Sequence, residues 1–118
     1  MHKVVYNNCY GGFSLSNEAV YWLLDNAADD ILKEYIKQSI DNTLSRYLGM
    51  VVADWFCNKR HHHDLIAVVE TLGNKANGEC ANLAIAEISS NQYRIEQYDG
   101  AEDVITPNDN HDWIFITG

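Results

Sequence analysis

Apolar side chains recur every four residues through the second quarter of the chain, at Leu32, Ile36, Ile40, Leu44 and Leu48. This spacing follows one face of an α-helix, and mostly polar side chains occupy the opposite face. Asp29 or Asp30 can cap the start of such a helix, and Gly49 stands where a left-handed C-terminal cap belongs. The pattern predicts a long amphipathic helix from about Asp30 to Leu48 whose stripe packs on a sheet or on a partner.

Other helix and strand signals lie on either side of this stripe. Residues 3–7 are β-branched and aromatic at their centre, which predicts an N-terminal strand. Ser16 is a good cap for a first helix, while Asp64 and Gly73 are suited to begin and end a third. Residues 50–57 suit either a buried strand or another helical turn, and we favour the strand.

The C-terminal part of the chain has the alternation of β-strands. Four strand-like runs follow one another, at residues 83–88, 93–98, 101–106 and 113–117. Asp99 and Gly100 separate two of them and form a favoured two-residue hairpin turn, because both positions of that turn require positive φ. The sequence therefore predicts an α+β fold with an N-terminal strand, about three helices and a C-terminal antiparallel meander.

Length and cysteine usage limit the organisation of the protein. The 118 residues, 47% of them hydrophobic, suffice for one domain spanning residues 1–118 with its own core. Cys9, Cys57 and Cys80 are far apart and lack paired spacing, which indicates a reducing compartment rather than a disulfide framework. No leader pattern or membrane-spanning apolar run is present. We therefore expect a cytoplasmic protein that does not enter a membrane.

The net charge of −9, from 17 acidic and 8 basic residues, limits the choice of partner. Such a protein repels phosphate backbones and anionic membrane surfaces, so we expect no direct binding of nucleic acid. The same charge attracts a basic protein surface, including one that normally binds nucleic acid. The alternative is that the acidity serves only solubility.

Two sets of residues are candidates for binding. The partner-binding set combines two aromatic residues beside a glycine turn with carboxylates on the strands expected to face solvent: Tyr10, Phe13, Glu96, Asp99, Glu102 and Asp103. The alternative set would hold a small anionic ligand through the glycine turn, a helix N-terminus and a basic patch: Gly11, Gly12, Ser16, Lys59, Arg60 and His61.

Catalysis and metal binding find little support in the sequence. Adjacent residues cannot converge on one ion, so of the three histidines at positions 61–63 only His61 and His63 have usable spacing. Nothing places Cys9 beside a histidine that could act as its base. We expect a protein that is not an enzyme and holds neither a structural metal nor a cofactor.

Three segments resemble a recurring family of small proteins encoded by bacteriophages and prophages. They are VVYNNCYGGFSLSNEA at residues 4–19, DLIAVVETLGNKANGECANLAIAEI at 64–88 and YRIEQYDGAEDV at 93–104, together nearly half of the chain. The CYGGFSLS and YDGAE stretches are the most specific, and residues 20–63 lie outside the resemblance.

The resemblance implies a viral or prophage origin and no particular chemistry. Accessory proteins of that origin commonly bind and block a host defence complex, such as a CRISPR effector, or sequester a nucleotide signal. The leading hypothesis is therefore a non-enzymatic inhibitor of a host protein or protein–nucleic acid complex, acting by stoichiometric binding. The alternative is a nucleotide-sequestering protein, for which a homodimer is one arrangement.

Overall fold

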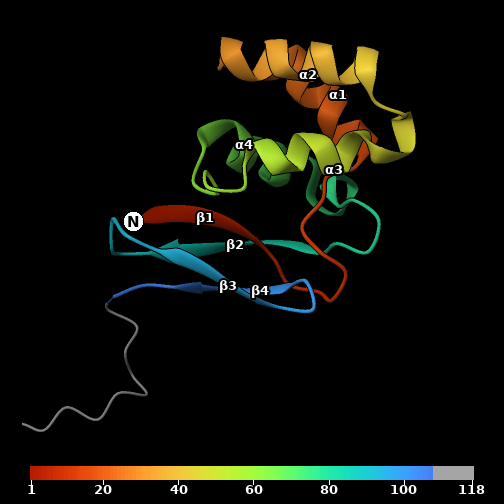
Figure 1. Ribbon diagram of the computed structural model, residues 1–118. Coiled ribbons are helices and arrows are strands. Elements are labelled where there is room, and N and C mark those ends of the chain that lie inside the picture. The colour runs from red at the N-terminus through yellow and green to blue at the C-terminus, as the bar shows by residue number, and fades with distance from the viewer. Residues whose placement is uncertain (108–118) are drawn as a thin grey trace, which may run out of the picture.

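A computed structural model of the chain describes residues 1–107 (Figure 1). The elements in chain order are β1 (His2–Asn7), α1 (Asn17–Asn26), α2 (Asp30–Asn42), α3 (Ser45–Trp55), α4 (His63–Leu72), a 3₁₀ helix (Gly73–Ala76), β2 (Leu83–Ile88), β3 (Arg94–Tyr98) and β4 (Ala101–Ile105). The predicted α+β class is confirmed, with four α-helices among residues 1–107 in place of about three. The strand predicted at residues 113–117 lies outside the described residues.

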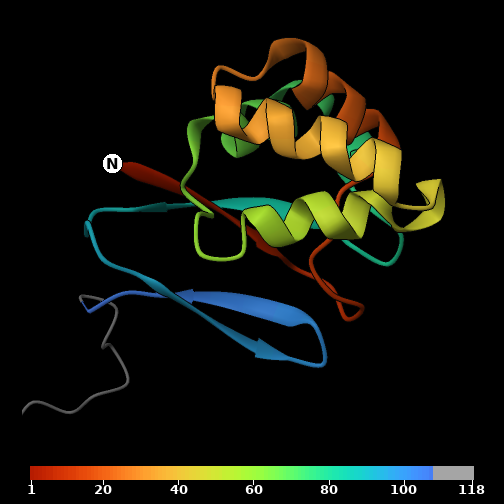
Figure 2. The same ribbon diagram turned by 45° about the horizontal axis from the view of Figure 1, so that its top comes forward.

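The elements form layers, with the helices on one side of β1 and β2 and the β3–β4 hairpin on the other (Figures 1 and 2). β1 pairs antiparallel with β2, and β3 pairs antiparallel with β4. Val5 joins the core cluster under the helices, and its neighbour Val4 lines a hollow with Tyr93 near the hairpin. Both valines are fully buried, so β1 is covered on its two faces.

The long helix predicted from Asp30 to Leu48 is wrong, because the chain breaks between α2 and α3. Thr43 is extended, with φ −129° and ψ 138°, and Leu44 precedes the first turn of α3 with its side chain 62% exposed. A continuous helix of this length would extend about 28 Å in one direction. The break instead lets Leu48 of α3 pack into the same core cluster as α2.

The strand favoured at residues 50–57 is also wrong, because α3 continues to Trp55. Gly49 lies inside this helix and not at a C-terminal cap. Leu15 N–H donates to the Gly49 carbonyl at 3.3 Å, and a Cβ on Gly49 would overlap the Leu15 carbonyl oxygen. Glycine is therefore required where α3 crosses the chain before α1.

The turn and cap predictions mostly hold. Asp99 and Gly100 have φ of 51° and 89°, as the predicted hairpin turn requires. Ser16 caps α1 by accepting the Ala19 N–H at 3.0 Å. The cap of α4 is His62 and not Asp64, which lies within the helix. Within residues 1–107, no helix combines the length and the apolar character needed to cross a membrane.

Candidate functional site

The outer face of the β3–β4 hairpin carries carboxylates and an aromatic ring. Side chains alternate along a strand, so Glu96 and Tyr98 share one face of β3. Asp103 of β4 lies directly opposite Glu96 in the antiparallel register. All three side chains are exposed, Tyr98 to 74%. Tyr98 is not among the predicted partner-binding residues, although its two-residue spacing from Glu96 places it on the same face of the strand.

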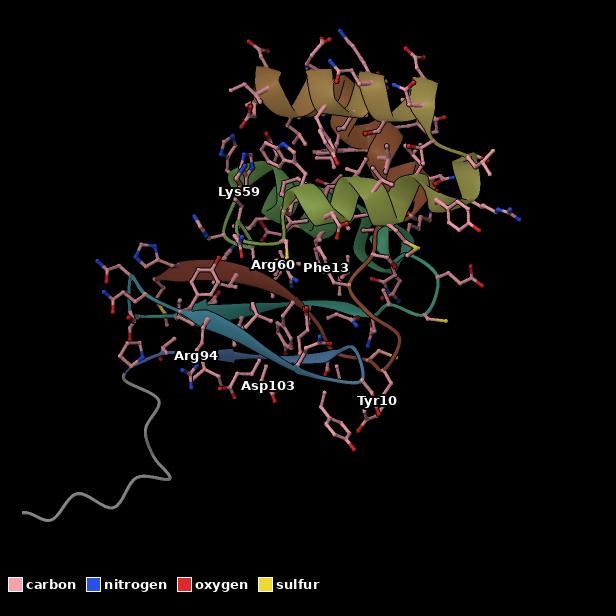
Figure 3. All side chains as sticks on the ribbon, in the orientation of Figure 1. Tyr10, Phe13, Lys59, Arg60, Arg94 and Asp103 are labelled. Carbon is pink, nitrogen blue, oxygen red and sulfur yellow. The ribbon has the colours of Figure 1, made fainter. Side chains whose placement is uncertain are left out.

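Tyr10 joins this face through a contact between two turns. Gly11 N–H donates to the Asp99 carbonyl at 3.2 Å, which places the turn after β1 against the hairpin turn. Tyr10 is 67% exposed and lies at that end of the molecule, while Asp103 lies on the hairpin, on the side of β1 and β2 away from the helices (Figure 3). We call Tyr10, Glu96, Tyr98, Asp99 and Asp103 the acidic–aromatic face. It brings together four of the six predicted partner-binding residues.

The charges on the acidic–aromatic face are only partly compensated. Two carboxylates directly opposite each other on paired strands repel, which opposes hairpin formation. Arg94 binds Glu96 at 2.8 Å in an exposed ion pair. Asp103 has no cationic partner among residues 1–107, so its charge remains available to a basic partner.

The other two predicted partner-binding residues, Phe13 and Glu102, do not belong to this face. Glu102 is buried and not exposed as predicted. Its carboxylate accepts the Asn7 N–H at 2.8 Å and two Arg60 N–H groups at 2.6 and 2.9 Å. The Phe13 ring lies 3.7 Å from the Arg60 guanidinium carbon. Glu102 points inward because it precedes Asp103 in the strand, and its paired charge permits burial.

The alternative ligand-binding residues do not form one site. Gly11 and Ser16 line a hollow of about 380 Å³, whereas Arg60 and His61 line a separate cleft of about 800 Å³. Arg60, predicted to bind an anion, is buried and neutralised by its carboxylate partner. Lys59 lies over the Trp55 ring, 3.7 Å from its centroid.

The glycine turn and the helix N-terminus have structural roles. Gly11 and Gly12 both adopt positive φ, and Gly100 of the hairpin packs so closely that a Cβ there would overlap their backbone nitrogens. The Ser16 hydroxyl donates to the Lys75 carbonyl in addition to capping α1. The Gly11 and Ser16 N–H groups also donate to backbone carbonyls, those of Asp99 and Ala76, so these two groups join segments of the chain and are not available to a phosphate.

The histidine segment is held by hydrogen bonds. His62 Nδ1 accepts the Asp64 N–H at 3.0 Å, so its Nε2 carries the proton and donates to Asp29, also at 3.0 Å. This hydrogen bond lowers the pKa of Asp29. His61 Nδ1 lies 2.6 Å from the Tyr93 hydroxyl, and burial raises the pKa of that phenol.

Among residues 1–107, the side chains of His62, His63 and Asp64 place their ligand atoms within 4.8 Å of one another, and His61 is not in this group. Both nitrogens of His62 already have partners, and both Asp64 oxygens accept backbone N–H groups, from Ala28 and Asp29. A metal would have to displace these bonds.

Comparisons with protein-family models, with curated proteins and with solved structures find no match to this chain.

Proposed function

We propose that this protein is a phage-encoded, non-enzymatic accessory protein that inhibits a host factor by binding it through the acidic–aromatic face. The observation that supports the proposal best is the exposed pair of facing carboxylates, Glu96 and Asp103, with Tyr98 beside them. Such a pair costs stability in the free protein, and a cationic partner would relieve the repulsion. Exposed tyrosines supply the rigid contact area that binding hot spots commonly use.

The partner that fits this chemistry is a host protein or protein–nucleic acid complex with a basic surface. A net charge of −9 would steer the inhibitor toward such a surface and speed their encounter. We expect the inhibitor to occupy an arginine-rich groove that normally holds nucleic acid. A CRISPR effector, the target of anti-CRISPR proteins, is a defence complex with such a groove. Binding would take place in the bacterial cytoplasm.

The test is affinity capture from the bacterial host with two variants of equal charge. Glu96→Lys with Asp103→Lys reverses the facing carboxylates, and Glu34→Lys with Asp41→Lys reverses two exposed carboxylates on α2. Each double variant changes the net charge from −9 to −5, because each lysine replaces one negative charge with one positive charge. We expect the hairpin variant to lose the captured partner and the α2 variant to retain it.

Salt dependence of the purified pair completes the test. Association should slow as the salt concentration rises and the Debye length falls from about 10 Å to about 3 Å. Circular dichroism would first establish that both variants fold. Equal capture by the two variants, or tighter binding by the hairpin variant, would contradict a role for the acidic–aromatic face.

A further inference from the structure

A cleft on the inner side of the hairpin is separate from the acidic–aromatic face. It has a volume of about 800 Å³ and lies between the end of α3 with its following loop and the β3–β4 hairpin. Asp54 and Asn58 line it on the first side, and Ile95 and Gln97 on the second. Pockets of about 300–1,000 Å³ are typical of sites that enclose a small molecule.

The residues that line the cleft carry equal numbers of positive and negative charges. Its lining residues include two arginines, Arg60 and Arg94, and two acidic residues, Asp54 and Glu102. Arg60 and Glu102 neutralise each other in a buried ion pair, and Arg94 binds Glu96 at the surface. A phosphate would therefore meet no unpaired arginine or lysine among the described lining residues, within a protein of net charge −9. The cleft favours an uncharged ligand.

The hydrogen-bonding groups around the cleft are mainly carboxamides. Gln97 Oε1 accepts the Gly100 N–H, whereas the side chains of Asn58, Asn91 and Gln92 have no hydrogen-bond partner among residues 1–107. A carboxamide offers a donor and an acceptor side by side, and this matches the edge of a nucleobase. All three residues are exposed, so their carboxamides are free to bind the edge of a planar heterocycle in the cleft.

Aromatic rings supply the surface on which such a heterocycle would lie. Phe13 and Tyr93 both line the cleft. Tyr93, His61 and Asn91 also line a smaller hollow of about 180 Å³ that reaches Val4 of β1. The Tyr93 hydroxyl lies 2.6 Å from His61 Nδ1, which joins this wall to the histidine segment. Bases stack on aromatic side chains with little dependence on sequence.

We infer that this cleft binds an uncharged, planar, hydrogen-bonding heterocycle of the nucleobase type, free or as its nucleoside. Tyr93 supplies ring surface, and the carboxamides of Asn58, Asn91 and Gln92 bind the ring edge. The inference does not depend on the proposed function, since the acidic–aromatic face points away from the cleft.

Titration of the isotopically labelled full chain with adenosine, guanosine, cytidine and uridine tests the inference. We expect at least one nucleoside to bind at concentrations up to about 1 mM, with amide shifts centred on residues 58 and 91–93. Tyr93→Ala should weaken that binding by about five- to a hundredfold, and Asn91→Ala by about tenfold. Asn74→Ala, an exposed asparagine outside the cleft, is the matched control and should bind as the wild type does.

Two further ligands show whether the cleft prefers a free nucleoside or a base that belongs to a nucleotide or a nucleic acid. The corresponding nucleoside monophosphate and a short single-stranded oligonucleotide should bind more weakly than the nucleoside, because both carry phosphate. If Tyr93→Ala does not fold, Tyr93→Phe should keep most of the affinity while Asn91→Ala still loses it. Failure of all four nucleosides to bind, or binding unchanged by Asn91→Ala, would overturn the inference. Tighter binding of the monophosphate or the oligonucleotide would overturn the preference for an uncharged ligand.

Discussion

The buried ion pair between Arg60 and Glu102 should be the most sensitive polar contact of the fold. Their side chains are 5% and 8% exposed, and Arg60 Nε already lacks a hydrogen-bond partner among the described residues. Glu102→Gln keeps the shape of the side chain but leaves the guanidinium buried without a counter-charge. Removing one member of such a pair costs about 3–5 kcal/mol, a large share of the roughly 5–15 kcal/mol that stabilises a domain. Urea denaturation followed by circular dichroism measures this loss as a lower midpoint.

Two further variants make the measurement decisive. Glu70→Gln breaks the exposed ion pair between Lys3 and Glu70, whose side chains are 41% and 46% exposed. This change should alter the urea midpoint little. The double variant Arg60→Met with Glu102→Leu replaces both charges with apolar groups and should recover part of the stability lost by Glu102→Gln, but not all of it, because the Asn7 N–H loses its acceptor. If Glu102→Gln cost no more than Glu70→Gln, or if the double variant were as unstable as the single one, the cost of an unpaired buried charge would not be the cause.

Three other changes test the helical layer. Gly49→Ala should lower the free energy of unfolding by at least about 1 kcal/mol, because overlap with Leu15 outweighs the helix propensity gained; a more stable variant would contradict that close approach. Ile40 is partly buried against the core, so Ile40→Ala should cost about 2 kcal/mol, and an unchanged melting temperature would show that it does not pack there. The hydrogen bond from His62 lowers the pKa of Asp29 in the folded protein. The ionised Asp29 carboxylate therefore stabilises the fold at pH values above the usual pKa of an aspartate, and this stabilisation is lost as the pH falls through the folded-state pKa. Asp29→Asn should therefore flatten the loss of stability between about pH 5 and about pH 3, and equal slopes in denaturation at those pH values would refute this.

Local chemistry made part of the fold predictable. The Asp99–Gly100 turn was predicted because its two positions need positive φ, and Ser16 because its hydroxyl can accept a backbone N–H at a helix start. The break at Thr43 was not predictable from the stripe, because the apolar period continues across it. A hydrophobic period reports which face is buried and not whether the backbone is continuous.

Most of the candidate site was predictable from the hairpin alone. Glu96, Asp99 and Asp103 lie in one short stretch, and their grouping follows from the predicted hairpin. The partnership of Glu102 with Arg60 joins residues 42 positions apart, and no local pattern encodes it. The sequence therefore predicts Arg60 to be part of a basic patch, although Glu102 neutralises its charge inside the protein.

This buried pair also determines which carboxylate the hairpin exposes. Glu102 and Asp103 are neighbours in β4, so one points inward and the other outward. A shift of β4 by one residue would turn Asp103 inward and Glu102 outward. The shorter aspartate would then have to pair with Arg60, and Asn7 N–H would lose its present acceptor. The bidentate contact with Arg60 thus favours a single register of the hairpin, because the alternative leaves buried polar groups poorly paired. Asp103 remains on the outer face, opposite Glu96, because its neighbour is required inside.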